Sequence, residues 1–115
     1  VDRRQRQMCI RDRQLDGSRA SFDGLAEVVD AVGDRLDVLL DSGIQRGTHI
    51  VKALSLGAKA VGIGRAYLFP LAAAGQPGVE RMIGLLRDEV VRDMRLMGAA
   101  KVADLSRDNI RYRRP

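Results

Sequence analysis

Residues 39–65 read LLDSGIQRGTHIVKALSLGAKAVGIGR, with a glycine-containing turn near each end and a helical pattern between the turns. The first turn follows an apolar run made of Leu36, Val38, Leu39 and Leu40, and the second lies in KAVGIG, residues 59–64. Short apolar runs that end at turn residues are typical of strands buried on both faces of a parallel sheet. The stretch therefore predicts a strand–helix–strand unit with both turns at the carboxyl ends of neighbouring strands.

Helical patterns precede and separate these two strands. Ser21 is a candidate N-cap for a helix that ends at Gly33, with apolar residues at helical spacing between them. Thr48 and Gly57 mark the start and end of a second helix of about ten residues.

The longest helix follows the second strand. Residues 65–77 read as a loop with a helical turn, broken by Pro70 and Pro77. From Gly78 to Gly98 apolar residues step by threes and fours along one face, which predicts a helix with a buried stripe; the stripe is Val79, Met82, Ile83, Leu86, Val90, Met94 and Met97. We interpret its methionines as core packing, and we predict no metal site.

The order helix, strand, helix, strand, helix indicates βαβ units, so the fold class is α/β with a parallel sheet. Two parallel strands need neighbours for their backbone groups and cover on both faces. We therefore expect an incomplete piece of a larger α/β fold.

The two turns favour a phosphate site. Backbone N–H groups at a strand-to-helix turn point outward, and glycine lets a ligand oxygen approach them closely. Gly43 lies in the first turn, and Gly64 and Arg65 lie in the second. Two adjacent turns of this kind match the phosphate site that (β/α)₈ barrels commonly form after strands 7 and 8. A dinucleotide fingerprint is disfavoured because Tyr67 stands where its third glycine belongs.

Composition and charge narrow the function further. The chain has 115 residues, no secretory pattern, and a single cysteine, Cys9, so cytoplasm is the expected location, with peripheral membrane association left open. Its net charge is +5, yet residues 1–13 and 107–115 each carry +3 and the middle carries −1. Basic ends around a neutral middle do not predict a specific nucleic-acid interface.

At this point the sequence resembles a known family. RQLDGS at residues 13–18, the stretch 39–65, and AAAGQPGVERMIGLLRDEVVRDMRLMGA at residues 72–99 are similar to the carboxyl-terminal part of the FMN-dependent α-hydroxy acid dehydrogenases and oxidases. That family includes the L-lactate, glycolate and mandelate enzymes. The resemblance implies the last strands and helices of a (β/α)₈ TIM barrel with FMN at its carboxyl-end face. It also implies oxidation of a small L-2-hydroxy acid, with electrons passing on to oxygen, a quinone or a cytochrome, and a homo-oligomer when full length.

The resemblance also implies site residues. By position, the FMN ribityl and phosphate contacts fall on six residues, namely Asp41, Ser42, Gly43, Gln45, Gly64 and Arg65. Arg13 matches the arginine that pairs with the substrate carboxylate. The base histidine of the family is replaced by Ile10, so no catalytic residue is predicted here. Gln45 stands where the family commonly has arginine, so we expect weaker phosphate anchoring, partly covered by Arg46 and Arg65.

These observations divide the chain into three parts. Residues 1–12 are expected to be unrelated or disordered, residues 13–110 to belong to the barrel, and residues 111–115 to form a basic tail. The lone histidine, His49, is interpreted as a surface or packing residue because a helical position past the first turn points away from the expected flavin face. Two alternatives stay open: another phosphate-binding barrel, such as a flavin-dependent isomerase or nucleotide dehydrogenase, and a small basic nucleic-acid-binding protein.

Overall fold

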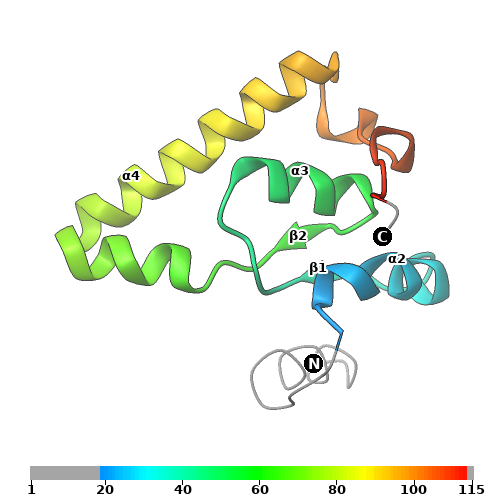
Figure 1. Ribbon diagram of the computed structural model, residues 1–115, viewed down its shortest axis with the longest axis horizontal. Helices are drawn as coiled ribbons and strands as arrows, with labels where there is room; N and C mark the ends of the chain where they lie inside the picture. The colour runs from blue at the N-terminus through cyan, green and yellow to red at the C-terminus, as the bar shows by residue number, and fades with distance from the viewer. Residues whose placement is uncertain (1–18, 114–115) are drawn as a thin grey trace.

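The computed structural model describes residues 19–113. Its elements run in the order helix, strand, helix, strand, helix, as the sequence predicts (Figure 1). They are α2 (Ser21–Val32), β1 (Leu39–Leu40), α3 (Gly47–Ser55), β2 (Ala60–Val61) and α4 (Arg65–Met97), followed by the short 3₁₀ helices η1 (Val102–Asp104) and η2 (Arg107–Asn109). Ile10 and Arg13, and the proposed boundary at residue 12, lie outside the described residues.

β1 and β2 form a parallel pair with α3 as the crossover. Leu39 is paired with Ala60 and Leu40 with Val61, and the Gly62 N–H extends the ladder by donating to the Leu40 carbonyl at 2.7 Å. In a parallel pair both carboxyl ends lie at the same edge. The predicted arrangement of the two turns is therefore confirmed.

The core lies between α2, α3 and the strands. Its buried members are Leu25, Val38, Leu40, Ile44, Ala53, Leu56 and Ala58. The prediction of strands buried on both faces is wrong for this part of the chain, because in β1 Leu40 is buried while Leu39 is 42% exposed. Within residues 19–113, no element covers Leu39 fully.

The start of α2 differs from its prediction. Ala20 holds the N-cap position and Ser21 is the first helical residue, buried and 4% exposed. The Ser21 hydroxyl donates to the main-chain carbonyl of Asp41 at 2.9 Å, so it ties the helix to the end of β1 instead of capping α2.

The predicted loop at residues 65–77 is wrong, because α4 begins at Arg65 and Pro70 lies within it. The helix bends into two arms, as Figure 1 shows, and the break falls at Gly75, whose φ of 64° and ψ of −144° are non-helical. A left-handed φ is accessible to glycine at little cost, and Pro77 is compatible with the first turn of the second arm. Gly98 ends α4 in the left-handed conformation, as predicted.

The apolar stripe of the second arm is only partly buried. Leu86 is 8% exposed, whereas Ile83 is 56% exposed and Met97 is 39% exposed. The prediction of a buried stripe is therefore wrong for most of its length within the described residues, where α3 covers only part of this helix. None of the helices described between residues 19 and 113 is long and apolar enough to cross a membrane.

The first turn of α3 is fixed by the second arm of α4. The Gly47 N–H donates to Glu89 Oε2 at 2.6 Å, and Arg46 Nε donates to both carboxylate oxygens of Glu89, at 3.0 and 3.2 Å. The hydrogen bond from the Gly47 N–H, followed by the hydrogen bond and the charge of Arg46, lowers the pKa of Glu89. A Cβ on Gly47 would collide with Glu89 Cβ and lie 2.8 Å from Val90 N, so only glycine fits this contact.

We predict that Gly47→Ala weakens the α3–α4 contact and lowers the free energy of unfolding by about 1–3 kcal/mol, as overpacking does. Gly84→Ala is the matched control, since a Cβ at Gly84 meets nothing within 4 Å. Gly84→Ala should raise the free energy of unfolding by about 0.5–1 kcal/mol, because alanine lowers the backbone entropy of the unfolded chain. Urea unfolding measures the free energy of unfolding of both variants. Equal values would contradict the close contact between Gly47 and α4.

We also predict a pH dependence for Glu89→Gln. A carboxylate whose pKa is lowered on folding stabilises the folded state above its unfolded value, about 4.3, and this stabilisation is lost as the pH falls through the lower folded value. Glu89→Gln should therefore be less stable than wild type at pH 7, and the gap should close in strong acid. Thermal unfolding across pH tests this, with Glu80→Gln on the exposed side of α4 as control. A gap that stays constant down to pH 2 would refute the assignment.

Candidate functional site

A hollow of about 230 Å³ lies at the carboxyl ends of β1 and β2. The structure brings together in it all six residues for which the sequence predicts cofactor contacts. Among residues 19–113, Ile44 and Ala66 also line the hollow; the lining there is Asp41, Ser42, Gly43, Ile44, Gln45, Gly64, Arg65 and Ala66. The two extra residues have apolar side chains, so a search for polar side chains does not find them.

The first turn adopts a backbone conformation that few residues tolerate. Ser42 and Gly43 have φ values of 94° and 77°, and Ser42 is the one non-glycine residue with positive φ among residues 19–113. Such a conformation costs a non-glycine residue on the order of 1–3 kcal/mol and is found mostly where function requires it. The Ser42 N–H donates to Asp41 Oδ1 at 2.9 Å, which helps to hold the turn.

His49 also supports this turn. It lies in the first turn of α3, not beyond it, and its Nδ1 accepts a hydrogen bond from the Gln45 N–H at 3.2 Å. The expectation that His49 lies past the first turn of the helix is therefore wrong. Its ring is partly buried and orders the turn, which agrees with the interpretation of a packing residue.

Backbone donors remain available around the hollow. Within residues 19–113, the N–H groups of Gly43 and Ile44 in the first turn donate to no acceptor. The same holds for Gly64, Arg65 and Ala66 at the second turn, where α4 begins without a side-chain cap. Unpaired N–H groups and the positive end of a helix dipole favour an anion. The hollow therefore offers donors from both turns at once.

The Asp41 carboxylate lies beside β2. A Cβ on Gly62 would come 2.8 Å from Asp41 Oδ1, so glycine at this position leaves room for the carboxylate. The main-chain carbonyl of Asp41 accepts the Ser21 hydroxyl. Sequence reasoning missed both supporting residues: Gly62 looks like a packing glycine, and Ser21 looks like a helix cap.

The charge of the hollow differs from expectation at one residue. Arg46 was expected to help hold a phosphate, but its guanidinium is paired with Glu89 and it does not line the hollow. The charged side chains of the lining are Arg65 and Asp41, of opposite sign. Attraction for an anion therefore depends on Arg65 and on the backbone donors.

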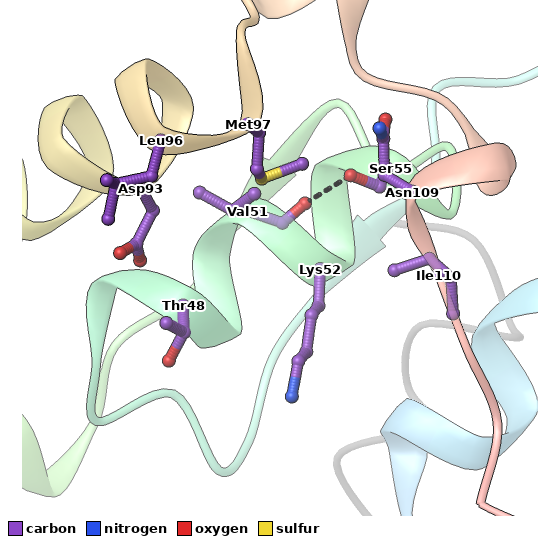
Figure 2. Close-up of a pocket in the computed structure, with 9 residues that line it drawn as sticks. All are labelled: Thr48, Val51, Lys52, Ser55, Asp93, Leu96, Met97, Asn109 and Ile110. Carbon is purple, nitrogen blue, oxygen red and sulfur yellow. Dashed lines mark hydrogen bonds between the residues drawn. The ribbon is translucent and has the colours of Figure 1, made fainter.

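A second hollow, of about 250 Å³, lies between α3, α4 and the segment after η2 (Figure 2). Its lining is largely apolar and includes Val51, Leu96, Met97 and Ile110, while Ser55 uses its hydroxyl on the Val51 carbonyl at 2.7 Å. One polar atom, Asp93 Oδ2, is buried there without a hydrogen-bond partner. Within residues 19–113, none of the six residues with expected cofactor contacts lines this hollow. The hollow at the strand ends is the better candidate.

Comparison with known proteins identifies the family. The family model described as FMN-dependent dehydrogenase matches residues 12–112. The L-lactate oxidase of Nostoc sp. is 52% identical over 93 residues, which is 81% of this chain and 26% of the relative. The pre-mycofactocin synthase of Mycobacterium tuberculosis is 53% identical over 92 residues, covering 80% of this chain and 23% of the relative.

Solved structures give the same result. The flavin-binding domain of baker's yeast flavocytochrome b2 superimposes with a TM-score of 0.79 and 46% identity, covering 84% of this chain and 26% of that one. Flavocytochrome b2 is a TIM barrel, and this chain corresponds to a small region of it with helices and two strands. The chain spans about a quarter of the length of the relatives it matches. It belongs to the FMN-dependent dehydrogenase family.

Proposed function

We propose that this chain is the carboxyl-terminal part of a (β/α)₈ barrel enzyme and that it holds the phosphate end of FMN. One observation carries the proposal. Two strand-to-helix turns, far apart in sequence, meet at one hollow, and both leave backbone donors without acceptors there. A helix start and a guanidinium at the same place suit a phosphate dianion.

The residues of the hollow divide into two groups. The N–H groups of Gly43, Ile44, Gly64 and Ala66, with the guanidinium of Arg65, are suited to phosphate oxygens. The Asp41 carboxylate repels phosphate but accepts hydrogen bonds from hydroxyl groups, so we assign it to the ribityl chain. Gln45 supplies a neutral donor where a cation would bind phosphate more strongly.

The size of the hollow supports this division. Pockets that hold a whole small molecule commonly measure about 300–1,000 Å³. The hollow, at about 230 Å³, is smaller, so it is suited to one end of FMN. Other parts of the barrel would enclose the flavin ring.

The proposed reaction is oxidation of a small L-2-hydroxy acid, such as lactate, to the 2-oxo acid. When bound, FMN supplies the acceptor for a hydride equivalent from the substrate. Arg13 is proposed to bind the substrate carboxylate through two parallel hydrogen bonds. Relatives of nearly equal identity are named L-lactate oxidase and pre-mycofactocin synthase, which fits a segment that holds the cofactor and leaves substrate choice to other parts.

We predict that Arg65→Gln in the full-length protein raises the Kd for FMN about 10- to 100-fold, since a charge-assisted hydrogen bond contributes about 1.5–3 kcal/mol. The Kd for riboflavin, which lacks the phosphate, should stay unchanged. Flavin fluorescence titration measures both. Arg81→Gln, an exposed arginine on the second arm of α4, is the control. An equal loss of affinity for both flavins would argue against a phosphate contact.

We further predict that the isolated 115-residue chain neither retains FMN nor oxidises lactate, because the hollow holds only one end of the cofactor. Gel filtration after mixing with FMN should separate protein from flavin absorbance. Stoichiometric yellow flavin in the protein peak would contradict this division of the site.

A further inference from the structure

Loop 41–45 leads directly into α3, and the start of α3 is held from outside its own segment. Arg46 is the N-cap residue and makes no side-chain cap. The cap comes from Glu89, which lies 42 residues after Gly47 in the sequence. Its Oε2 accepts the Gly47 N–H at 2.6 Å. An N-cap oxygen normally comes from the residue beside the helix. Here a carboxylate on a different helix fixes the point at which the loop ends.

Helix α4 therefore contacts both sides of the hollow. Its first residues, Arg65 and Ala66, line the hollow at the second turn. After the bend at Gly75, its second arm brings Glu89 to the end of the first turn. The same helix that supplies donors at one turn thus sets the position of the other.

We propose that Glu89 is a positioning residue for the cofactor phosphate: it holds the end of loop 41–45 at Gly47. This inference rests on the proposed function. Glu89 does not line the hollow, so it acts through Gly47. Its side chain is 21% exposed and that of Arg46 is 68% exposed.

The charges around Glu89 suit this role. Arg46 faces it from the end of the loop, and Arg92 contributes from the next turn of α4. Both favour the ionised carboxylate, which is the form that accepts hydrogen bonds from Gly47 and Arg46 together. Without the carboxylate, the first N–H of α3 would lose its acceptor, and the end of loop 41–45 would lose its contact with α4.

The test compares FMN with riboflavin in the full-length protein. Glu89→Ala should raise the Kd for FMN about 10-fold, the effect usual for a residue that orients a ligand-binding group. The Kd for riboflavin should change less than about twofold, within ordinary variation between mutants. A general loss of stability would weaken the binding of both flavins equally. The ratio of the two Kd values therefore separates a positioning role from a structural one.

Two further variants complete the design. Glu89→Gln keeps an oxygen for the Gly47 N–H, but a neutral amide accepts more weakly than a carboxylate, so its FMN-to-riboflavin ratio should lie between those of wild type and Glu89→Ala. Glu80→Gln, an exposed glutamate whose Oε1 accepts from Gln76, should match wild type. If Glu89→Ala does not fold, the ratio of the Kd for FMN to the Kd for riboflavin in Glu89→Gln is the deciding measurement. A ratio equal to that of wild type overturns the proposal.

The proposed function and this inference fail in different ways. If Arg65→Gln leaves FMN affinity unchanged, the phosphate does not bind in the hollow. A different outcome is that Arg65→Gln selectively weakens FMN binding while Glu89→Ala leaves the ratio of the two Kd values at the wild-type level. In that case the phosphate site is supported and Glu89 has no positioning role.

Discussion

The parallel pairing of β1 and β2 is the constraint on which the site depends. The pairing of Leu40 with Val61 places the ends of both strands at one edge, so that two turns separated by a helix share a single hollow. An antiparallel pairing would put these turns at opposite ends, and neither turn alone would surround an anion. The hydrogen bond from the Gly62 N–H to the Leu40 carbonyl continues the ladder to the edge of the site. Two residue pairs add little stability by themselves, but they bring both turns to one site.

Two helices hold this edge in place from outside the strands. From α2, the buried hydroxyl of Ser21 binds the main-chain carbonyl of Asp41, and from α4, the carboxylate of Glu89 binds the N–H of Gly47. These contacts lie just before and just after the turn that carries Ser42 in its strained conformation. A strained turn persists only when its surroundings determine it. The proposed phosphate site is therefore a product of tertiary contacts as much as of the glycine-rich sequence.

Local signals account for what the sequence predicts well, and distant contacts account for what it does not. Apolar runs and glycines identify the strands, the turns and the lining residues Gly43, Gly64 and Arg65, because those signals lie within a few residues of one another. The other expected contacts, Asp41, Ser42 and Gln45, come from the resemblance to the family. The helix through Pro70 is missed because proline ordinarily ends a helix. The partners of Ser21 and Arg46 are missed because they lie 20 and 43 residues away. The apolar stripe around Ile83 predicts burial that the described residues alone do not supply.

A structure of the full-length protein with FMN bound tests the central claim most directly. The account predicts that the phosphate oxygens lie within hydrogen-bonding distance, about 2.7–3.2 Å, of backbone N–H groups from both turns and of the Arg65 guanidinium. It also predicts that Arg46 remains paired with Glu89 in that complex. A phosphate bound elsewhere, with loop 41–45 and Gly64 in contact only with other protein groups, would contradict it.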